Sequence, residues 1–336
     1  MARALALARR GEGHTRPNPP VGAVVVSDGK IVGEGWHRRC GGDHAEVAAL
    51  KDTLRRGNSP KGASVYVTLE PCSRPGRVGA CTDALIAAGV SRVVFACGDP
   101  NPVNRGRAKR ILGRAGIACE KMKSAEAEAL IAPFAKHVTC SLPYVTVKIA
   151  MSLDGRICDD FGGARWISSA AARKATGALR NRVDAIMVGA ETLRADDPGL
   201  LPHEGRNDDL LRVVVTRSGK LPRKAKVFCD GRNETAVFRI GAKGGCVRGM
   251  QSAADLRDMM EQLGKRGIMH VLCEGGLKLA VSLAEAGLVD EWISVLSPCV
   301  VGTRRIEEKK TFVPAGGGYA VRAGEDTIAR FLCSRD

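Results

Sequence analysis

The sequence predicts an α/β fold made of two domains. Its 336 residues are more than one small hydrophobic core usually organises, since compact domains commonly hold about 100 to 200 residues. Apolar runs typical of strands alternate with segments of helical periodicity in both halves of the chain. We therefore predict a first domain over residues 1–140 and a second over residues 141–336, with the boundary in the stretch Lys136–Pro143.

The first domain is expected to begin with a helix and a hairpin. Met1–Arg10 alternates Ala and Leu with Arg, as an amphipathic helix does, and it lacks the small-residue cleavage site of a signal peptide. The apolar run Val21–Val26 and its return Ile31–Gly35 flank Asp28-Gly29, a dipeptide typical of a tight turn. Periodicity further predicts helices over His44–Arg56, Thr82–Ala88, Gly106–Ala115 and Ala125–His137, and strands over Ser64–Leu69 and Arg92–Ala96.

The second domain repeats this alternation of strand and helix, which predicts a sheet covered by helices. The expected helices are Ser169–Arg182, Ala253–Leu263 and Leu277–Ala286. The expected strands are Tyr144–Ala150, Ala185–Val188, Leu211–Val215, His270–Cys273 and Glu291–Leu296.

The composition narrows the classes of function. The formal net charge is +16, but Lys and Arg are spread along the chain instead of forming basic runs. We interpret the charge as a solvated surface suited to phosphorylated small molecules, and we expect no nucleic-acid partner, although a nucleic-acid footprint is the alternative. No segment approaches the roughly 20 consecutive apolar residues of a membrane span, so we expect no membrane partner.

The twelve cysteines are scattered along a chain without a recognisable secretion signal. This distribution favours reduced thiols and a cytoplasmic location over a disulfide framework. Cys97, Cys119, Cys229 and Cys299 lie in apolar, strand-like runs, where a cysteine is expected to act as a small buried hydrophobe.

Three potential metal ligands stand out in the first half. His44 precedes a predicted helix, Cys72 follows the strand that ends near Leu69, and Cys81 comes after eight intervening residues. One imidazole and two thiolates form a tetrahedral zinc set with one open position, the arrangement of a catalytic site. Glu46, two residues after the histidine, is suitably placed to transfer protons. A structural zinc site, with Cys40 as a fourth ligand, is the alternative.

Longer motifs around these residues resemble the bifunctional riboflavin biosynthesis family RibD. The cysteine spacing is also that of the family, whereas cytidine and tRNA adenosine deaminases typically separate these cysteines by two residues. The motifs are Pro17-Asn18-Pro19-Pro20-Val21-Gly22-Ala23-Val24-Val25-Val26, His44-Ala45-Glu46-Val47, Val67-Thr68-Leu69-Glu70-Pro71-Cys72-Ser73, Asp99-Pro100-Asn101-Pro102 and Gly106-Arg107.

The resemblance implies a cytidine-deaminase-like domain that removes an amino group from a phosphoribosylaminopyrimidine. It assigns Asn18, His37, Arg77, Asp99 and Asn101 to the pocket for this substrate. Asn and Asp side chains suit exocyclic amino and carbonyl groups, and His and Arg suit phosphate. The sequence departs from the family after Cys72-Ser73, where Arg74 replaces the usual histidine and is expected to take over a substrate contact.

The second half lacks a Gly-x-Gly-x-x-Gly motif after a strand, so a standard Rossmann site is not predicted. Two strand-to-helix junctions instead place glycines where backbone N–H groups can approach a phosphate: Val188-Gly189-Ala190-Glu191-Thr192 and Glu274-Gly275-Gly276. Taken alone, each is more simply explained as an ordinary tight turn.

Further runs here resemble the RibD reductase domain, a dihydrofolate-reductase-like fold that uses NADPH to reduce the ribosyl group of the deaminated product. They are Lys148–Gly155, Trp166–Ser169, Ile186–Thr192, Ala195–Pro198 and Glu274–Gly276. The implied substrate contacts are Arg180, Leu200 and Glu274. The implied NADPH contacts are Ala150, Trp166, Thr192, Asp196, Gly276, Leu277, Lys278, Leu279, Ala280, Val281 and Ser282.

Departures from the family leave alternatives open for this half. Leu201 and His203 replace the usual Thr and Arg, Ala164 stands where Ser is common, and Thr216-Arg217 replaces Asp-Ser. His203 is therefore expected to contact the substrate as a weaker cation, or the reductase half is inactive. A nucleic-acid deaminase with a basic accessory domain and a zinc-stapled binding module are the other hypotheses. We expect a homo-oligomer.

Overall fold

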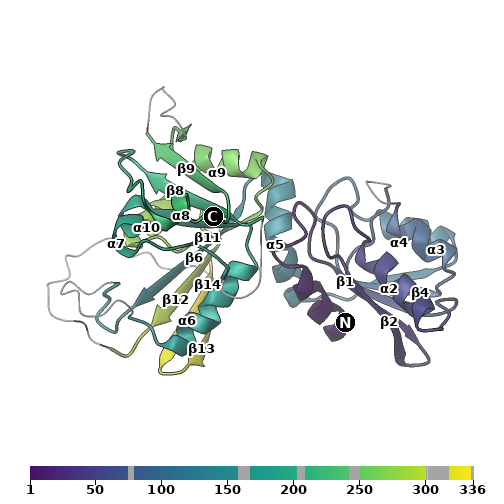
Figure 1. The fold of residues 1–336 in the computed structure, drawn as a ribbon. Coiled ribbons are helices and arrows are strands. Elements are labelled where there is room, and N and C mark those ends of the chain that lie inside the picture. The colour runs from purple at the N-terminus through teal and green to yellow at the C-terminus, as the bar shows by residue number, and fades with distance from the viewer. Residues whose placement is uncertain are drawn as a thin grey trace. The chain divides into compact units, whose positions relative to one another are not determined.

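The computed structural model describes residues 1–74, 79–157, 167–202, 209–241, 250–299, 301 and 318–333. The chain divides into two compact units, Met1–Ser141 and Leu142–Asp336, and each is described by itself (Figure 1). The predicted α/β class is confirmed in both units. In the part of the chain that the structure describes, no helix combines the length and apolar character needed to cross a bilayer.

The first unit is built on a five-stranded sheet in the order β2-β1-β3-β4-β5. β1 pairs antiparallel with both β2 and β3, whereas β3, β4 and β5 run parallel. The strands β2, β3 and β4 therefore end at the same edge of the sheet. The strands are β1 (Gly22–Ser27), β2 (Lys30–Trp36), β3 (Ser64–Leu69), β4 (Arg92–Cys97) and β5 (Ala118–Lys121).

Helices cover this sheet, and apolar residues of the strands and helices form one core beneath them. The predicted strands and helices of this unit are present within a few residues of their expected bounds, and only β5 was not predicted. The helices are α1 (Ala2–Ala8), the 3-10 turn η1 (Arg9–Gly11), α2 (Ala45–Arg55), α3 (Cys81–Ala87), α4 (Arg107–Arg114) and α5 (Ala125–Cys140).

Helix α2 packs unusually close to strand β2. A Cβ atom built at Gly35 of β2 would lie 2.3 Å from the backbone N of Ala49 and 2.5 Å from the backbone O of Ala45. Only a glycine leaves room for this approach of two backbones. The contact fixes where α2 begins, and the first turn of α2 carries Glu46.

The second unit is built on a nine-stranded sheet in the order β10-β9-β8-β7-β11-β6-β12-β14-β13. The first seven strands of this order, from β10 through β12, run parallel to one another. The last two, β14 and β13, form an antiparallel hairpin, and β14 also pairs antiparallel with β12. The strands are β6 (Tyr144–Met151), β7 (Ala185–Gly189), β8 (Leu211–Thr216), β9 (Thr235–Ile240), β10 (Gln251–Ala253), β11 (His270–Cys273), β12 (Glu291–Leu296), β13 (Gly318–Ala323) and β14 (Asp326–Leu332).

Both faces of this sheet are buried, as expected where parallel strands are covered on two sides. Ala185 and Met187 of β7 belong to the core on one face, and the alternate residues Ile186 and Val188 belong to the core on the other. The helices are α6 (Ala170–Gly177), the 3-10 turn η2 (Ala178–Asn181), α7 (Ala190–Asp196), α8 (Lys226–Cys229), α9 (Leu256–Lys265) and α10 (Leu277–Glu285).

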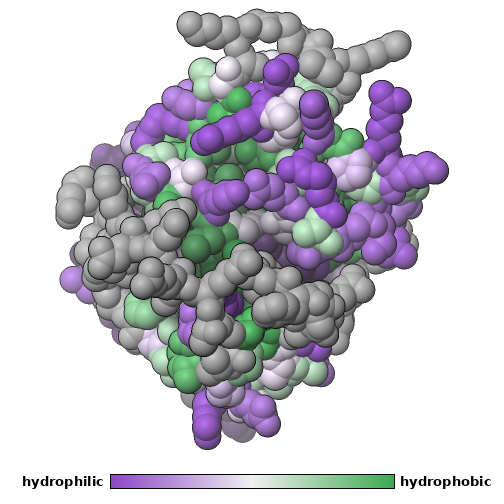
Figure 2. Space-filling model, turned by 90° about the vertical axis from the view of Figure 1, so that its left-hand side faces the viewer, coloured by the Kyte–Doolittle hydropathy of each residue, from purple (hydrophilic) through white to green (hydrophobic). Residues whose placement is uncertain are grey.

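Two expectations about buried cysteines were wrong. Cys97 and Cys119 are buried as predicted, but Cys229 and Cys299 are exposed. Cys229 ends the short helix α8, and Cys299 follows β12 after it has left the sheet. An apolar stretch of sequence therefore does not guarantee that its cysteine is buried. The face shown in Figure 2 likewise carries both hydrophilic and hydrophobic residues.

Candidate active sites

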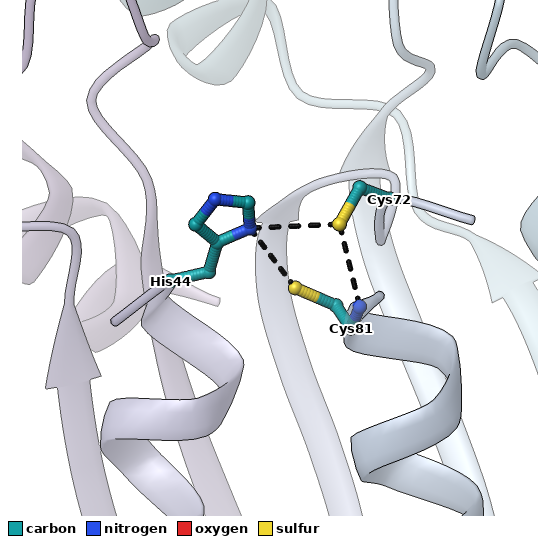
Figure 3. Close-up of side chains that lie close together, drawn as sticks. All are labelled: His44, Cys72 and Cys81. Carbon is teal, nitrogen blue, oxygen red and sulfur yellow. Dashed lines mark hydrogen bonds between the residues drawn. The ribbon is translucent and has the colours of Figure 1, made fainter. Parts of the chain in front are cut away.

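Three side chains converge at the edge of the first sheet where β2, β3 and β4 end (Figure 3). His44 is the N-cap residue of α2, Cys72 lies in the loop after β3, and Cys81 is the first residue of α3. The His44 Nδ1 atom lies 3.2 Å from Cys81 Sγ and 3.5 Å from Cys72 Sγ. All three donor atoms lie within 4.8 Å of one another.

This donor set fits a zinc ion. Zn–S bonds of about 2.3 Å and Zn–N bonds of about 2.0 Å, at tetrahedral angles, place an imidazole nitrogen about 3.5 Å from a thiolate sulfur. The two N···S distances given above are close to that separation. Cys40 is not a member of the cluster, so the described residues provide three protein ligands, which favours an open catalytic site over a closed structural one.

The surroundings favour a thiolate at Cys72. The backbone N–H of Cys81, at the start of α3, donates a hydrogen bond to Cys72 Sγ over 3.3 Å. The hydrogen bond from the Cys81 thiol, followed by that of His44, lowers the pKa of the Cys72 thiol. The thiolate is the form of cysteine that binds a metal ion, so a lowered pKa favours metal binding at Cys72.

Glu46 lies beside this cluster in the first turn of α2 and is only 3% exposed. Burial, followed by repulsion from Cys72, raises the pKa of its carboxyl group to about 7. A carboxyl group in such a position can both accept and release a proton near neutral pH.

His37 and Asn18 form a pair next to the cluster. The His37 ring stands edge-on to the His44 ring, with 5.3 Å between their centroids. His37 Nδ1 donates to the backbone O of Asp43 over 2.9 Å, so Nε2 carries the lone pair and accepts from the Asn18 amide at 3.0 Å. Burial lowers the pKa of the His37 imidazole. Both ring nitrogens of His37 therefore have partners within the protein, and His37 holds the side chain of Asn18 in place.

Asp99 and Asn101 lie in the loop that follows β4. Asp99 Oδ1 accepts from the backbone N–H of Asn101 over 2.8 Å, and Asn101 Oδ1 accepts from that of Val103 over 3.1 Å. Arg105 donates to the backbone O of Pro100 over 3.1 Å. Burial raises the pKa of the Asp99 carboxyl group. The loop is therefore held by its own side chains.

The two arginines expected near the pyrimidine have different outcomes. Arg74 is exposed in the loop after Cys72. Arg77 lies outside the described residues. The same holds in the second unit for Trp166 and His203, and for Ala164, which stands where the family commonly has Ser.

In the second unit, two of the residues that the resemblance assigns to the substrate contact each other. Arg180 Nε donates to Glu274 Oε2 over 3.0 Å, and a second bond of 2.5 Å joins its terminal nitrogen to the same oxygen. Arg180 also donates to the backbone O of Leu201 over 3.3 Å. Leu200 is 1% exposed and belongs to the hydrophobic core, so only its backbone, which has a positive φ of 49°, is available for a substrate.

The predicted glycine junctions also come together. A Cβ atom at Gly275 would lie 2.8 Å from the backbone N of Gly189, so the turn before α7 and the turn before α10 are in backbone contact. The backbone N–H of Gly276 donates to Thr192 Oγ1 over 3.0 Å. Because β6, β7 and β11 are adjacent and parallel, Ala150 near the end of β6 lies at the same edge.

The remaining predicted NADPH contacts differ in how accessible they are. Leu277, Lys278 and Val281 are exposed, although Lys278 forms an ion pair with Glu191 at 3.1 Å. Asp196, at the end of α7, is exposed, while Leu279 and Ser282 are half-buried. Ala280 is fully buried in the core, so its side chain is not available to a cofactor.

Sequence reasoning missed residues that support the first site. The backbone O of Asp43 fixes the His37 ring, Arg105 holds the loop after β4, and Glu70 accepts hydrogen bonds from that loop. Glu70 could have been noticed, since it lies within the motif Thr68-Leu69-Glu70-Pro71-Cys72. Nothing in the sequence marks Asp43 for its backbone oxygen.

Comparison with known families agrees with this geometry. Residues 1–97 match the cytidine and deoxycytidylate deaminase zinc-binding region. Residues 143–314 match the RibD C-terminal domain.

Curated relatives extend over most of the chain. The riboflavin biosynthesis protein RibD of Escherichia coli is 40% identical over 326 residues, which cover 90% of this chain and 88% of that protein. The RibD protein of Aquifex aeolicus is 37% identical, with coverage of 90% and 87%.

Solved structures are similar over nearly the full length. Acinetobacter baumannii RibD superimposes with a TM-score of 0.85 at 33% identity, covering 99% of this chain and 98% of that one. The Thermotoga maritima diaminohydroxyphosphoribosylaminopyrimidine deaminase/5-amino-6-(5-phosphoribosylamino)uracil reductase gives a TM-score of 0.88 at 31% identity, with coverage of 99% and 97%.

Proposed function

The chain belongs to the RibD family, and we propose that its two units perform consecutive steps, deamination in residues 1–140 and reduction in residues 141–336. The protein is a bifunctional deaminase and reductase of riboflavin biosynthesis, with Zn²⁺ and NADPH as its cofactors. A nucleic-acid deaminase with a basic accessory domain is not favoured, since the relatives named above match both units.

The proposed first step is hydrolytic deamination of 2,5-diamino-6-(5-phosphoribosylamino)pyrimidin-4(3H)-one. The observation that carries this proposal is the convergence of His44, Cys72 and Cys81 beside the buried carboxyl group of Glu46. When bound to these three ligands, Zn²⁺ lowers the pKa of water to about 7. Glu46 accepts the proton of the attacking water and delivers it to the departing amine.

The pyrimidine is held by side chains around this centre. One N–H of the Asn18 amide is donated to His37, and the carboxamide oxygen and the second N–H are proposed to face the substrate. Asp99 and Asn101 offer acceptors and donors for the exocyclic groups of the ring. The exposed Arg74 is proposed to attract the phosphate, and Arg77 is proposed to share this role.

The proposed second step reduces the ribosyl chain of the deaminated product to give 5-amino-6-(5-phosphoribitylamino)uracil. NADPH supplies the hydride. Arg180 and Glu274 orient the substrate, and His203 is proposed to add a cationic contact. The backbone N–H groups at the start of α10 are suited to a cofactor phosphate, because a helix N-terminus favours anions.

The NADPH site is proposed at the edge where Ala150, Thr192 and Gly276 lie. Trp166, Asp196 and the exposed residues of α10 complete the proposed contacts. We also propose a cytoplasmic location and a homo-oligomeric state. Light scattering coupled to size-exclusion chromatography tests the second of these.

Two readouts test the two steps separately. The purified protein is incubated with the diaminopyrimidine phosphate, with and without NADPH, while ammonia release and NADPH oxidation are followed in parallel. We expect ammonia release in both conditions and NADPH oxidation only after deamination has begun. NADPH loss without ammonia release would contradict the order of steps, and ammonia release alone would show an inactive reductase half.

A further inference from the structure

We propose that Glu70 is a positioning residue for the deamination step, since its carboxylate holds the loop that carries Asp99 and Asn101. This inference rests on the substrate roles proposed above for those two residues. Both carboxylate oxygens of Glu70 accept hydrogen bonds from the backbone of this buried region, so Glu70 acts on the loop and not on the substrate.

Three backbone N–H groups donate hydrogen bonds to the Glu70 side chain. Oε2 accepts from Asp99 over 3.2 Å and from Gly106 over 3.1 Å, and Oε1 accepts from Ala108 over 3.2 Å. The donors lie at the start of the loop, at its end and in the first turn of α4. One carboxylate therefore fixes both ends of the loop between β4 and α4, which carries Asp99 and Asn101 and is called the substrate loop below.

The same carboxylate completes helix α4. The N-cap residue of α4, Gly106, has a positive φ of 73° and no side chain to accept from the first N–H groups of the helix. Glu70 supplies that acceptor from another part of the chain, and its negative charge suits the positive end of the helix. The hydrogen bonds from Asp99 and Ala108 are buried, and leaving those two N–H groups without an acceptor would be unfavourable.

Glu70 is also tied to the metal ligands. Its own backbone N–H donates to the backbone O of Cys97 over 2.8 Å, which joins the ends of β3 and β4. Cys72 follows two residues later in the same segment. Glu70 thus sets the spacing between the zinc ligand loop on one side and the substrate loop on the other. A displaced loop would weaken substrate binding while leaving the three metal ligands in place.

The test is a Glu70→Gln variant of the full-length protein. The amide keeps the shape of the side chain, but its N–H₂ group would face at least one backbone donor, so at least one of the three hydrogen bonds is lost. We expect KM for the pyrimidine to rise about 10-fold, the scale of one hydrogen bond to a charged group. We expect kcat to change less than about threefold, with zinc content unchanged.

Asp52→Asn is the matched control. The Asp52 carboxylate is also largely buried and accepts a backbone N–H, that of Glu34, over 2.9 Å. It lies in α2 and has no contact with the substrate loop. We expect this variant to lower the melting temperature without changing KM. An equal rise in KM for both variants would overturn the proposal, because it would reflect general destabilisation.

A second measurement does not depend on activity. Hydrogen exchange of the Asp99, Gly106 and Ala108 amides is expected to accelerate in Glu70→Gln and to stay unchanged in Asp52→Asn. If wild-type protein shows no deamination, the proposed function fails, whereas exchange still reports whether Glu70 holds the loop. Unchanged exchange and unchanged KM would overturn the inference. Should Glu70→Gln not fold, Glu70→Asp, which keeps the charge but shortens the reach, is measured in the same way.

Discussion

Two glutamates of the first unit show how surroundings decide the role of a carboxyl group. Glu46 is buried beside a thiol that tends to lose its proton, and burial raises its pKa to about 7. Glu70 is similarly buried, but its carboxyl group accepts hydrogen bonds from three backbone N–H groups. The first is therefore suited to exchanging a proton, and the second to fixing a backbone.

At the residue scale, Glu46→Gln is expected to remove deamination and leave reduction intact. The amide occupies the same space but cannot accept the proton of water, so kcat for ammonia release should fall by about 10²- to 10⁴-fold. Zinc content, measured by plasma mass spectrometry, should be unchanged, and NADPH oxidation with the deaminated substrate should continue. Ammonia release near the wild-type rate would show that another group moves the proton.

A buried ion pair in the second unit gives a pH-dependent prediction. Arg212, whose side chain is 3% exposed, contacts Asp230 at 2.7 Å, and this hydrogen bond lowers the pKa of the Asp230 carboxyl group. A lowered pKa stabilises the fold above the unfolded value of about 4, and the contribution is lost as pH falls through the folded value. Asp230→Asn leaves Arg212 without its anion and is expected to cost about 3 kcal/mol at pH 7.

The measurement for this pair is urea unfolding of both proteins between pH 7 and pH 3. The difference in unfolding free energy should shrink below about pH 4, because protonated Asp230 then resembles asparagine. A difference as large at pH 3 as at pH 7 would contradict the assignment.

Side chains with intrinsic chemistry could be predicted from the sequence, whereas supporting contacts that depend on the course of the backbone could not. His44, Glu46, Cys72 and Cys81 have the spacing and residue types of a known chemistry, and the structure brings them together. The link between His37 and Asn18 depends on the course of the loop before β1, which no local pattern encodes.

At the element scale, the contact between the turns before α7 and α10 depends on Gly275. Its absent Cβ would lie 2.8 Å from a backbone N and 3.0 Å from the Cα of Val188. Gly275→Ala should separate the turns, destabilise the protein by about 1–3 kcal/mol and raise Kd for NADPH. Calorimetric titration with NADPH and thermal unfolding measure the two effects.

Gly113→Ala is the control for this substitution. Gly113 lies in α4, and a Cβ atom there would meet no atom within 4 Å. Alanine should stabilise the helix by about 0.5–1 kcal/mol and leave NADPH binding unchanged. If both variants bind NADPH as tightly as wild type, the close packing of the two turns is not needed for the cofactor.

Elements with clear periodicity were predictable, whereas elements defined by their neighbours were not. β3 has the predicted bounds, and β8 extends one residue beyond its prediction. The strand β5 (Ala118–Lys121) is short, and all its residues except Cys119 are exposed, so it forms because β4 provides a partner. The strands β13 and β14 likewise carry exposed residues. β14 pairs with β12 and β13 pairs with β14, so the hairpin joins parts of the chain that are distant in sequence.

At the scale of the whole molecule, each unit has its own hydrophobic cores. Removing zinc should therefore affect one activity. Treatment with 1,10-phenanthroline is expected to abolish ammonia release and lower the melting temperature of the first unit, because a bound ligand stabilises the folded state. NADPH oxidation with the deaminated substrate should continue, and added Zn²⁺ should restore ammonia release. Equal loss of both activities would show that the units are not independent.

The hairpin β13–β14 determines when the second unit can become complete during synthesis. β14 pairs with β12 in the sheet, and Asp326 accepts the backbone N–H of Ser169, 157 positions earlier, over 2.7 Å. The first unit can fold while the ribosome is still adding residues, since domains generally fold in order from the N-terminus. The exposed flank of β12, in contrast, waits until residues 326–332 have been synthesised, and a ribosome that stalls before them would leave it open to unwanted pairing with another chain.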